Sequence, residues 1–316
     1  MSINKILLIL ILIIGINTNA KAETWNEPWQ KEIIKKSEYF VLARVISNID
    51  SIGTKIKIIK YFGNQKLTGE ILINGFSQLQ MTSSSGHGLH LDFEKDQIIY
   101  FLLSKRDDGN FEIPTPTSGY AVVDEDKNVY ATYRHSYHQA SIPQEIYEKT
   151  YTAIWNYYKT SSFNKEQIIG FINENIEKEP AGFGEDEISL FFLQHAALET
   201  AYLLDLTIEL DKLKKFIDFE NFHSNVSALQ LLRNSDNKET KEYLFNYIKN
   251  EDNENFQKVI AIWSLNKIGG KEYRKRLSKI KDKLSDEDTG FGGNIMDPRV
   301  GTHFPSPKSA IEVLGK

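Results

Sequence analysis

The stretch Ser227-Ala228-Leu229-Gln230-Leu231-Leu232 has a counterpart 33 residues later, Ile260-Ala261-Ile262-Trp263-Ser264-Leu265. Ala228 then matches Ala261, and Leu232 matches Leu265. The same offset relates Lys238-Glu239 to Lys271-Glu272 and Leu244 to Leu277. A small alanine lets two helices cross closely, and a leucine one turn later fills the adjoining hole. The offset therefore predicts helical hairpins that repeat along the chain and stack on one another.

Two further copies extend the repeat in both directions. Ser309-Ala310-Ile311-Glu312-Val313-Leu314 resembles the first stretch, and a fainter copy lies 31 residues before it, at Ala197 and Leu213. The last copy is displaced because Asp286–Pro307, which is rich in glycine and proline, precedes it. A loop of this length is unusual unless it is functional or disordered. Three interpretations stay open for Asp286–Pro307: a packed cap, a binding loop or disorder.

On these residues, the region from about 185 to 316 resembles the HEAT-repeat family, especially its bacterial members with a short period. The resemblance implies an α-solenoid with a continuous groove. The alternative is an irregular helical bundle, because short amphipathic helices can mimic the spacing. Upstream, apolar residues three and four apart predict helices within 146–158 and 168–176, and the apolar run Ile188–Leu206 predicts a buried helix.

The chain changes character near residue 140. Before it, short runs of β-branched and aromatic residues alternate with glycine, asparagine and aspartate, which predicts strands. The predicted strands are Tyr39–Ile49, Thr54–Phe62, Glu70–Phe76, Gln97–Leu103, Tyr120–Val123 and Val129–Tyr133. Asp124–Asn128 separates the last two and predicts a hairpin connection. We therefore expect an α+β protein, with a β domain at 23–140 and an all-α domain at 141–316.

The β half also has a family resemblance. Ser37–Val45 leads into Ile56–Gly63, and Ile71–Ile73 and Asp96–Leu103 follow. In strand order and apolar pattern, residues 37–104 resemble the netrin or tissue-inhibitor-of-metalloproteinase type of OB barrel found in exported bacterial proteins. The resemblance implies a small closed sheet with a binding face. The cysteines that anchor the N-terminus of the animal members are absent, so protease inhibition is not carried over.

The first 22 residues have the features of a secretory signal peptide. Lys5 precedes the apolar run Ile6–Ile16, and Ala20-Lys21-Ala22 supplies a small-x-small cleavage site. The run is too short for a membrane-spanning helix, which needs about 20 apolar residues. We expect cleavage after Ala22 and a periplasmic or secreted protein. Trp25 and Trp29 then follow the new N-terminus, and we expect them to pin it to a domain surface.

Composition narrows the class of protein. The chain has 316 residues, no cysteine and a formal charge of −5, which becomes −7 once the leader with Lys5 and Lys21 is removed. A mildly acidic surface repels phosphates, so we expect no nucleic-acid partner. Because no disulfide can form, an exported fold must depend on packing alone, and this favours a bacterial protein.

Histidines and a carboxylate supply the candidate site residues. They are His87, His90, Asp92, His135 and His138. Imidazole and carboxylate groups are good zinc ligands, and the two groups could meet at the rim of the barrel. Residues three apart on a loop or strand need not converge, however, and the helical H-E-x-x-H motif is absent. We therefore expect surface or hydrogen-bonded histidines, with no metal and no cofactor.

Other motifs lead to structural interpretations. Asp124–Asn128 matches the start of a calcium loop but lacks its glycine and closing glutamate. The sequence contains neither a nucleotide-binding glycine loop nor a serine-hydrolase elbow. His195 and His223 lie in helical surroundings and are expected to be core or groove residues bonded to backbone carbonyls. Trp155 and Trp263 fall on apolar stripes and are expected in the core.

These observations favour an exported, non-catalytic binding or scaffold protein that engages a protein or peptide. Stacked hairpins offer a groove, and a barrel offers a second surface. The alternative is a hydrolase of unrecognised type, with its site near Ser83–Asp92 or between the two domains. A third possibility is a structural component that uses neither surface.

Overall fold

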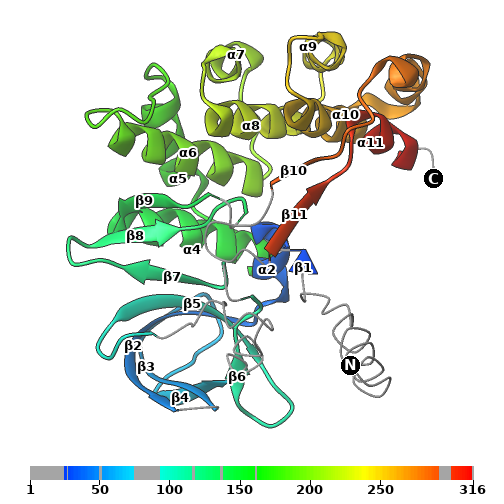
Figure 1. The fold of residues 1–316 in the computed structure, drawn as a ribbon. Coiled ribbons are helices and arrows are strands. Elements are labelled where there is room, and N and C mark those ends of the chain that lie inside the picture. Colours follow the sequence, from blue (N-terminus) through cyan, green and yellow to red (C-terminus); the bar gives the residue numbers. More distant parts are fainter. Residues whose placement is uncertain are drawn as a thin grey trace, which may run out of the picture.

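The computed structural model describes residues 25–26, 28–49, 52–74, 93–115, 118–135, 138–160, 162–291 and 300–314. Figure 1 shows a β-barrel at one end, rows of helices at the other, and strands β7–β9 with helix α4 between them. The α+β fold class is confirmed. The predicted signal peptide and the candidates His87, His90 and Asp92 lie outside the described residues.

Five strands close the barrel. They are β2 (Tyr39–Ile49), β3 (Gly53–Phe62), β4 (Glu70–Asn74), β5 (Ile98–Lys105) and β6 (Phe111–Glu112). Their order is β2-β3-β4-β6-β5, and β5 pairs back to β2. The β4–β6 pair is parallel and the others are antiparallel. The barrel is therefore OB-like, as expected, although the two-residue strand β6 was not predicted.

Strand β2 shows how the barrel joins the helices. Successive side chains of a strand point to opposite faces. Val41 and Val45 accordingly lie in the apolar core inside the barrel, whereas Phe40 lies in a second core outside it. Helices α2 (Gln30–Lys36) and α4 (Gln144–Thr160) cover this outer face. Trp155 of α4 contacts the Phe40 ring and is buried, which confirms its expected place in the core.

Three more strands extend the sheet from β5 towards the helices. They are β7 (Tyr120–Val123), β8 (Asn128–Ala131) and β9 (Ala140–Pro143), paired in that order. The predicted hairpin between β7 and β8 is confirmed, because the amide of Asn128 donates to Asp124 Oδ1 and Lys127 takes a positive φ of 62°. Strand β9 lies where the sequence pattern changes from strands to helices, near residue 140. It leads into α4 and packs against α6.

The helical region is an array of antiparallel helices. They are α5 (Lys165–Ile176), α6 (Ile188–Leu203), α7 (Leu210–Asp218), α8 (Phe222–Leu231), α9 (Lys238–Lys249), α10 (Asn255–Ile280) and α11 (Pro307–Val313). A single 3-10 turn, Leu232–Asn234, follows α8, and another, Lys281–Lys283, follows α10. Helix α10 consists of two helices that meet at Gly270, whose φ of 59° and ψ of −160° are not helical. No helix among the described residues is long and apolar enough to cross a bilayer.

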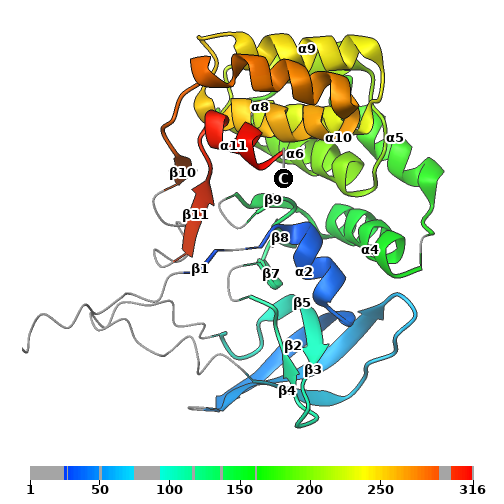
Figure 2. The same ribbon diagram turned by 90° about the vertical axis from the view of Figure 1, so that its right-hand side faces the viewer.

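The repeated alanines occupy equivalent places in this array. Helices α6, α8 and the first half of α10 lie side by side in the row nearer the barrel, and α7, α9 and the second half of α10 form the outer row (Figures 1 and 2). Ala197, Ala228 and Ala261 lie in the inner row, and all three are fully buried in one continuous core. Ala310 of α11 is buried in the same core. The alanines that the sequence offsets relate are therefore all core residues of the helical array.

The glycine-rich segment before α11 folds back towards the other end of the chain. It carries β10 (Thr289–Phe291) and β11 (Val300–Phe304), which pair with each other in antiparallel fashion. Strand β11 also pairs in parallel with β1 (Trp25–Asn26), so that this segment runs down beside the array to the N-terminal strand (Figure 2). Of the three interpretations of Asp286–Pro307, the described parts support a packed segment.

Candidate functional site

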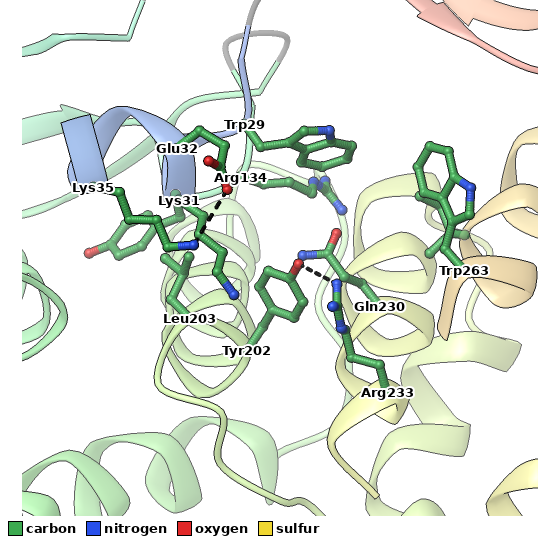
Figure 3. Close-up of a pocket in the computed structure, with 12 residues that line it drawn as sticks. Trp29, Lys31, Glu32, Lys35, Arg134, Tyr202, Leu203, Gln230, Arg233 and Trp263 are labelled. Carbon is green, nitrogen blue, oxygen red and sulfur yellow. Dashed lines mark hydrogen bonds and ion pairs between the residues drawn. The ribbon is translucent and has the colours of Figure 1, made fainter. Parts of the chain in front are cut away.

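A pocket of about 350 Å³ lies between helix α2 and the inner row of the array (Figure 3). Small-molecule sites usually span about 300–1,000 Å³, so this one is small. The N-terminal segment, the turn after β8 and the helices α6, α8 and α10 all contribute to its wall. The lining residues are Trp29, Lys31, Glu32, Lys35, Tyr133, Arg134, Tyr202, Leu203, Gln230, Arg233, Ile260 and Trp263.

Positive charge gathers at this pocket although the chain as a whole is acidic. Lys31 and Lys35 extend from α2, and Arg233 faces them from the turn after α8 (Figure 3). Glu32 supplies one opposing charge and lies 3.7 Å from the Lys35 ammonium. Burial lowers the pKa of Lys31, Asp205 opposes that effect, and the positive charges of Arg233, Lys35 and Lys267 add to it. The pocket thus has a cationic wall that an anion would stabilise.

Two polar groups at the pocket have hydrogen-bonding capacity in reserve. Arg233 donates from Nη1 to the Tyr202 hydroxyl at 2.9 Å, while its Nε atom is buried without a hydrogen-bond partner. Gln230 is only 5% exposed, and its amide nitrogen also has no partner. Buried donors in proteins are nearly always paired, so each of these two could take one further acceptor.

Two indoles complete the pocket and are held by one phenylalanine. Trp29 lies 5.8 Å from the Phe304 ring, edge to face, and Trp263 lies 5.5 Å from the same ring. Phe304 ends strand β11 and is itself buried. Trp29 therefore packs near the N-terminus as expected, whereas Trp263 is only half-buried and lines the pocket as well as packing on the core.

The sequence candidates His135 and His138 are buried against the helical array rather than at a barrel rim. The His135 ring lies 5.5 Å from the Trp29 indole. His138 stacks on His223 at 3.8 Å and meets His195 edge to face at 4.2 Å. The structure thus brings together three histidines: His138 just before β9, His195 in α6 and His223 in α8. From the sequence, His195 and His223 were expected only as core or groove residues.

A buried ion pair adjoins these histidines. Arg134 Nη1 lies 3.4 Å from Glu199 Oε1, and both side chains are completely buried. The Ser227 hydroxyl donates to Glu199 Oε1 at 2.6 Å and lies 3.4 Å from His195 Nδ1. The partner of His195 Nδ1 is therefore a hydroxyl rather than the expected backbone carbonyl. We name Arg134, His138, His195, Glu199, His223 and Ser227 the junction cluster.

Burial and positive charge keep the histidines of the junction cluster neutral. Burial lowers the pKa of His138 and His195 well below the usual value, and neighbouring rings and Arg134 add to the effect. Burial followed by the Arg134 charge lowers the pKa of His223 to about 3. Burial raises the pKa of Glu199, against the opposing effects of Arg134 and the Ser227 hydrogen bond.

The junction cluster has the residue types of a serine hydrolase but not the arrangement. In such enzymes the histidine accepts the serine proton and the carboxylate orients the histidine. Here Ser227 donates directly to Glu199, and Ser227 is only 1% exposed. Across the described ranges, no group of three or more His, Asp or Glu side chains is placed to hold a metal ion. The cluster is therefore a structural link between the β strands and the array.

The pocket could not be found from any single stretch of sequence. Lys31, Gln230 and Arg233 carry no motif. They meet because α2, which packs on α4 and β5, lies across the pocket from the inner row of the array. The sequence offset revealed the repeated stretch that contains Gln230, but it could not show that the Gln230 side chain lines the pocket. No family model, curated protein or solved structure gives a significant match to this chain.

Proposed function

We propose that this chain is an exported, non-catalytic binding protein that engages a protein or peptide through the pocket between α2 and the helical array. One observation carries the proposal: cations, indoles and an unpaired amide donor from distant segments converge on one pocket. Tryptophan and arginine are enriched among the residues that contribute most to protein interfaces. The pocket supplies both types beside an otherwise acidic surface.

The pocket is also preorganised, which favours binding. Phe304 packs on both indoles, and Tyr202 accepts a hydrogen bond from Arg233 before any ligand arrives. Side chains already held in place lose less conformational entropy when a partner binds. A fixed wall of this kind suits recognition of one or two anchoring side chains of a partner.

Export and the two family assignments are parts of the same proposal. Export is supported by Lys5, the apolar run Ile6–Ile16 and the alanines at 20 and 22. HEAT-like ancestry of the array is supported by the 33-residue offset and by the burial of Ala228 and Ala261. Netrin-like ancestry of the barrel is supported by its strand order.

A site-specific crosslink tests the binding function. The photoreactive residue p-benzoylphenylalanine would replace Trp263 in the full chain expressed in its own host. A second variant of the same chain would carry the photoreactive residue in place of Lys275, which is exposed on the outer part of α10 and does not line the pocket. We expect a discrete protein adduct at 263 and none at 275 after illumination. Identical adduct patterns at both positions, or turnover of model ester and peptide substrates without adducts, would contradict the proposal.

A further inference from the structure

We propose that the pocket recognises the C-terminal residue of a peptide, binding its free carboxylate beside Arg233, Gln230 and Lys31 and its apolar side chain between Trp29 and Trp263. This inference rests on the proposed binding function and specifies the ligand. It follows from the charge, the unpaired donors, the aromatic wall and the size of the pocket.

The charge of the pocket calls for an anion. Arg134 is already neutralised by Glu199, and Glu32 lies beside Lys35. Arg233 and Lys31 remain, on opposite sides of the pocket (Figure 3), and Asp205 acts on Lys31 without lining the pocket. Burying like charges near one another is unfavourable, and a bound anion relieves that repulsion. Hydrogen bonds between such an anion and the cationic side chains are charge-assisted, and these are about twice as strong as neutral hydrogen bonds.

The unpaired donors suit a carboxylate. Arginine binds a carboxylate through a planar fork of N–H groups, and one of its fork atoms, Nε of Arg233, is buried and unpaired. The Gln230 amide nitrogen is a second buried donor without a partner. A carboxylate has two oxygens and about four acceptor sites, so it carries enough acceptors for two donors.

The aromatic wall and the volume indicate the end of a chain. Trp29 and Trp263 line the same pocket and are both fixed by Phe304. An apolar side chain attached to the carboxylate would lie against these indoles. A volume of about 350 Å³ is near the lower limit of small-molecule sites, so it accommodates one terminal residue rather than a chain that passes through.

The experiment compares N-acetylphenylalanine with its C-terminal amide, and a pentapeptide ending in phenylalanine with its amide, each titrated into the full chain. Binding is followed by calorimetry and by the indole N–H signals in NMR spectra. We expect both free acids to bind at least about tenfold more tightly than the amides, because the amides lack the charge that strengthens the hydrogen bonds to the pocket. Arg233→Gln and Gln230→Leu should each weaken binding of the free acids more than binding of the amides, which narrows the difference between acid and amide.

Lys275→Gln serves as the matched control, because it removes the same charge from an exposed site outside the pocket. Its affinity for the free acids should stay within about twofold, as expected for a screened surface charge. Thermal melts of all variants establish that they fold.

Each other outcome overturns a distinct statement. Equal binding of acid and amide would overturn the carboxylate inference and leave the binding function in place. Binding of N-acetylphenylalanine but not of the pentapeptide would overturn the peptide assignment and the proposed function with it. Competition by inorganic phosphate that depends on Arg233 would show a general anion site and overturn the inference. Absence of binding by all four probes, with the crosslink at 263 still formed, would overturn the inference alone.

Discussion

The Arg134 guanidinium and the Glu199 carboxylate form an ion pair of 3.4 Å in which neither side chain has any contact with solvent. Arg134 follows strand β8, and Glu199 lies in α6, so the pair crosses the junction between the sheet and the array. Arg134 also lines the pocket. The ion pair therefore fixes one wall of the pocket relative to the other, and removing it should affect both stability and binding.

Arg134→Met should destabilise the protein by about 3–5 kcal/mol, because it leaves the Glu199 carboxylate buried without its partner. Urea unfolding at neutral pH measures the change. The matched control is Lys55→Met, which breaks an exposed pair with Glu70 at 2.7 Å and should leave the free energy of unfolding nearly unchanged. The double variant Arg134→Met, Glu199→Leu should recover most of the loss. Equal costs for the two single variants would contradict a buried pair at this junction.

Acid should destabilise the protein through the junction cluster. A histidine whose folded pKa is lowered stays neutral in the native state, while the unfolded chain takes up its proton below about pH 6.5. For His223, whose folded pKa is about 3, stability is therefore fully present above pH 6.5 and is lost as the pH falls from 6.5 towards 3. The maximum slope is about 1.4 kcal/mol per pH unit for each such histidine.

Urea midpoints of the wild type and of His223→Gln at several pH values between 7 and 5 test this pH dependence. The variant should lose stability less steeply over that interval, because one proton uptake by the unfolded chain has been removed. Parallel curves would show that His223 is not held neutral by its surroundings. Most carboxylates titrate below this interval, and both proteins contain the same ones, so the difference between the two curves reports on His223.

Gly270→Ala and Gly170→Ala form a matched pair. A new Cβ would find open space at both positions, so steric clashes cannot distinguish them. Gly270 has a φ of 59° and a ψ of −160°, a conformation that costs other residues about 1–3 kcal/mol. Gly170 lies inside helix α5, where alanine is favoured by about 1 kcal/mol. Thermal melts should move in opposite directions, and a gain in stability for Gly270→Ala would argue against the break in α10.

Ala261→Leu tests the equivalence of the repeats. Ala261 is fully buried where the inner helices meet, and adding a larger side chain to a tight core typically costs about 1–3 kcal/mol. Ser278→Leu, at an exposed position of the same helix, provides the comparison. Chemical unfolding should separate the two clearly. An unchanged midpoint for Ala261→Leu would mean that the alanine does not lie at a close helix crossing.

Much of the backbone could be predicted because local patterns determined it. Strands β2 and β7 have the predicted bounds, since β-branched and aromatic runs bounded by polar turns define them. The helix predicted over Ile188–Leu206 ends earlier, at Leu203, because Asp205 adopts a positive φ of 52°. Helix α2 was missed, since seven residues with two buried isoleucines are too few to show a period.

The site could not be predicted because it depends on packing between distant segments. Gln230 and Ser227 lie three residues apart in the repeated stretch, yet one lines the pocket and the other belongs to the junction cluster. Which helix face meets α2 and which meets α6 is decided by the tertiary fold. The ring contacts of His138 likewise form only when folding places His195 and His223 beside it, and the sequence around His138 does not reveal them.

The parallel pairing of Trp25 with Val300 joins residues from nearly opposite ends of the chain. Contacts so remote in sequence form late, because closing a long loop costs entropy before any contact is gained. During synthesis Trp25 leaves the ribosome long before Val300 exists. A chain halted before residue 300 would therefore hold its barrel and most of its helices, but Trp29 and Trp263 would lack Phe304, and we expect such a fragment to leave the pocket wall unassembled.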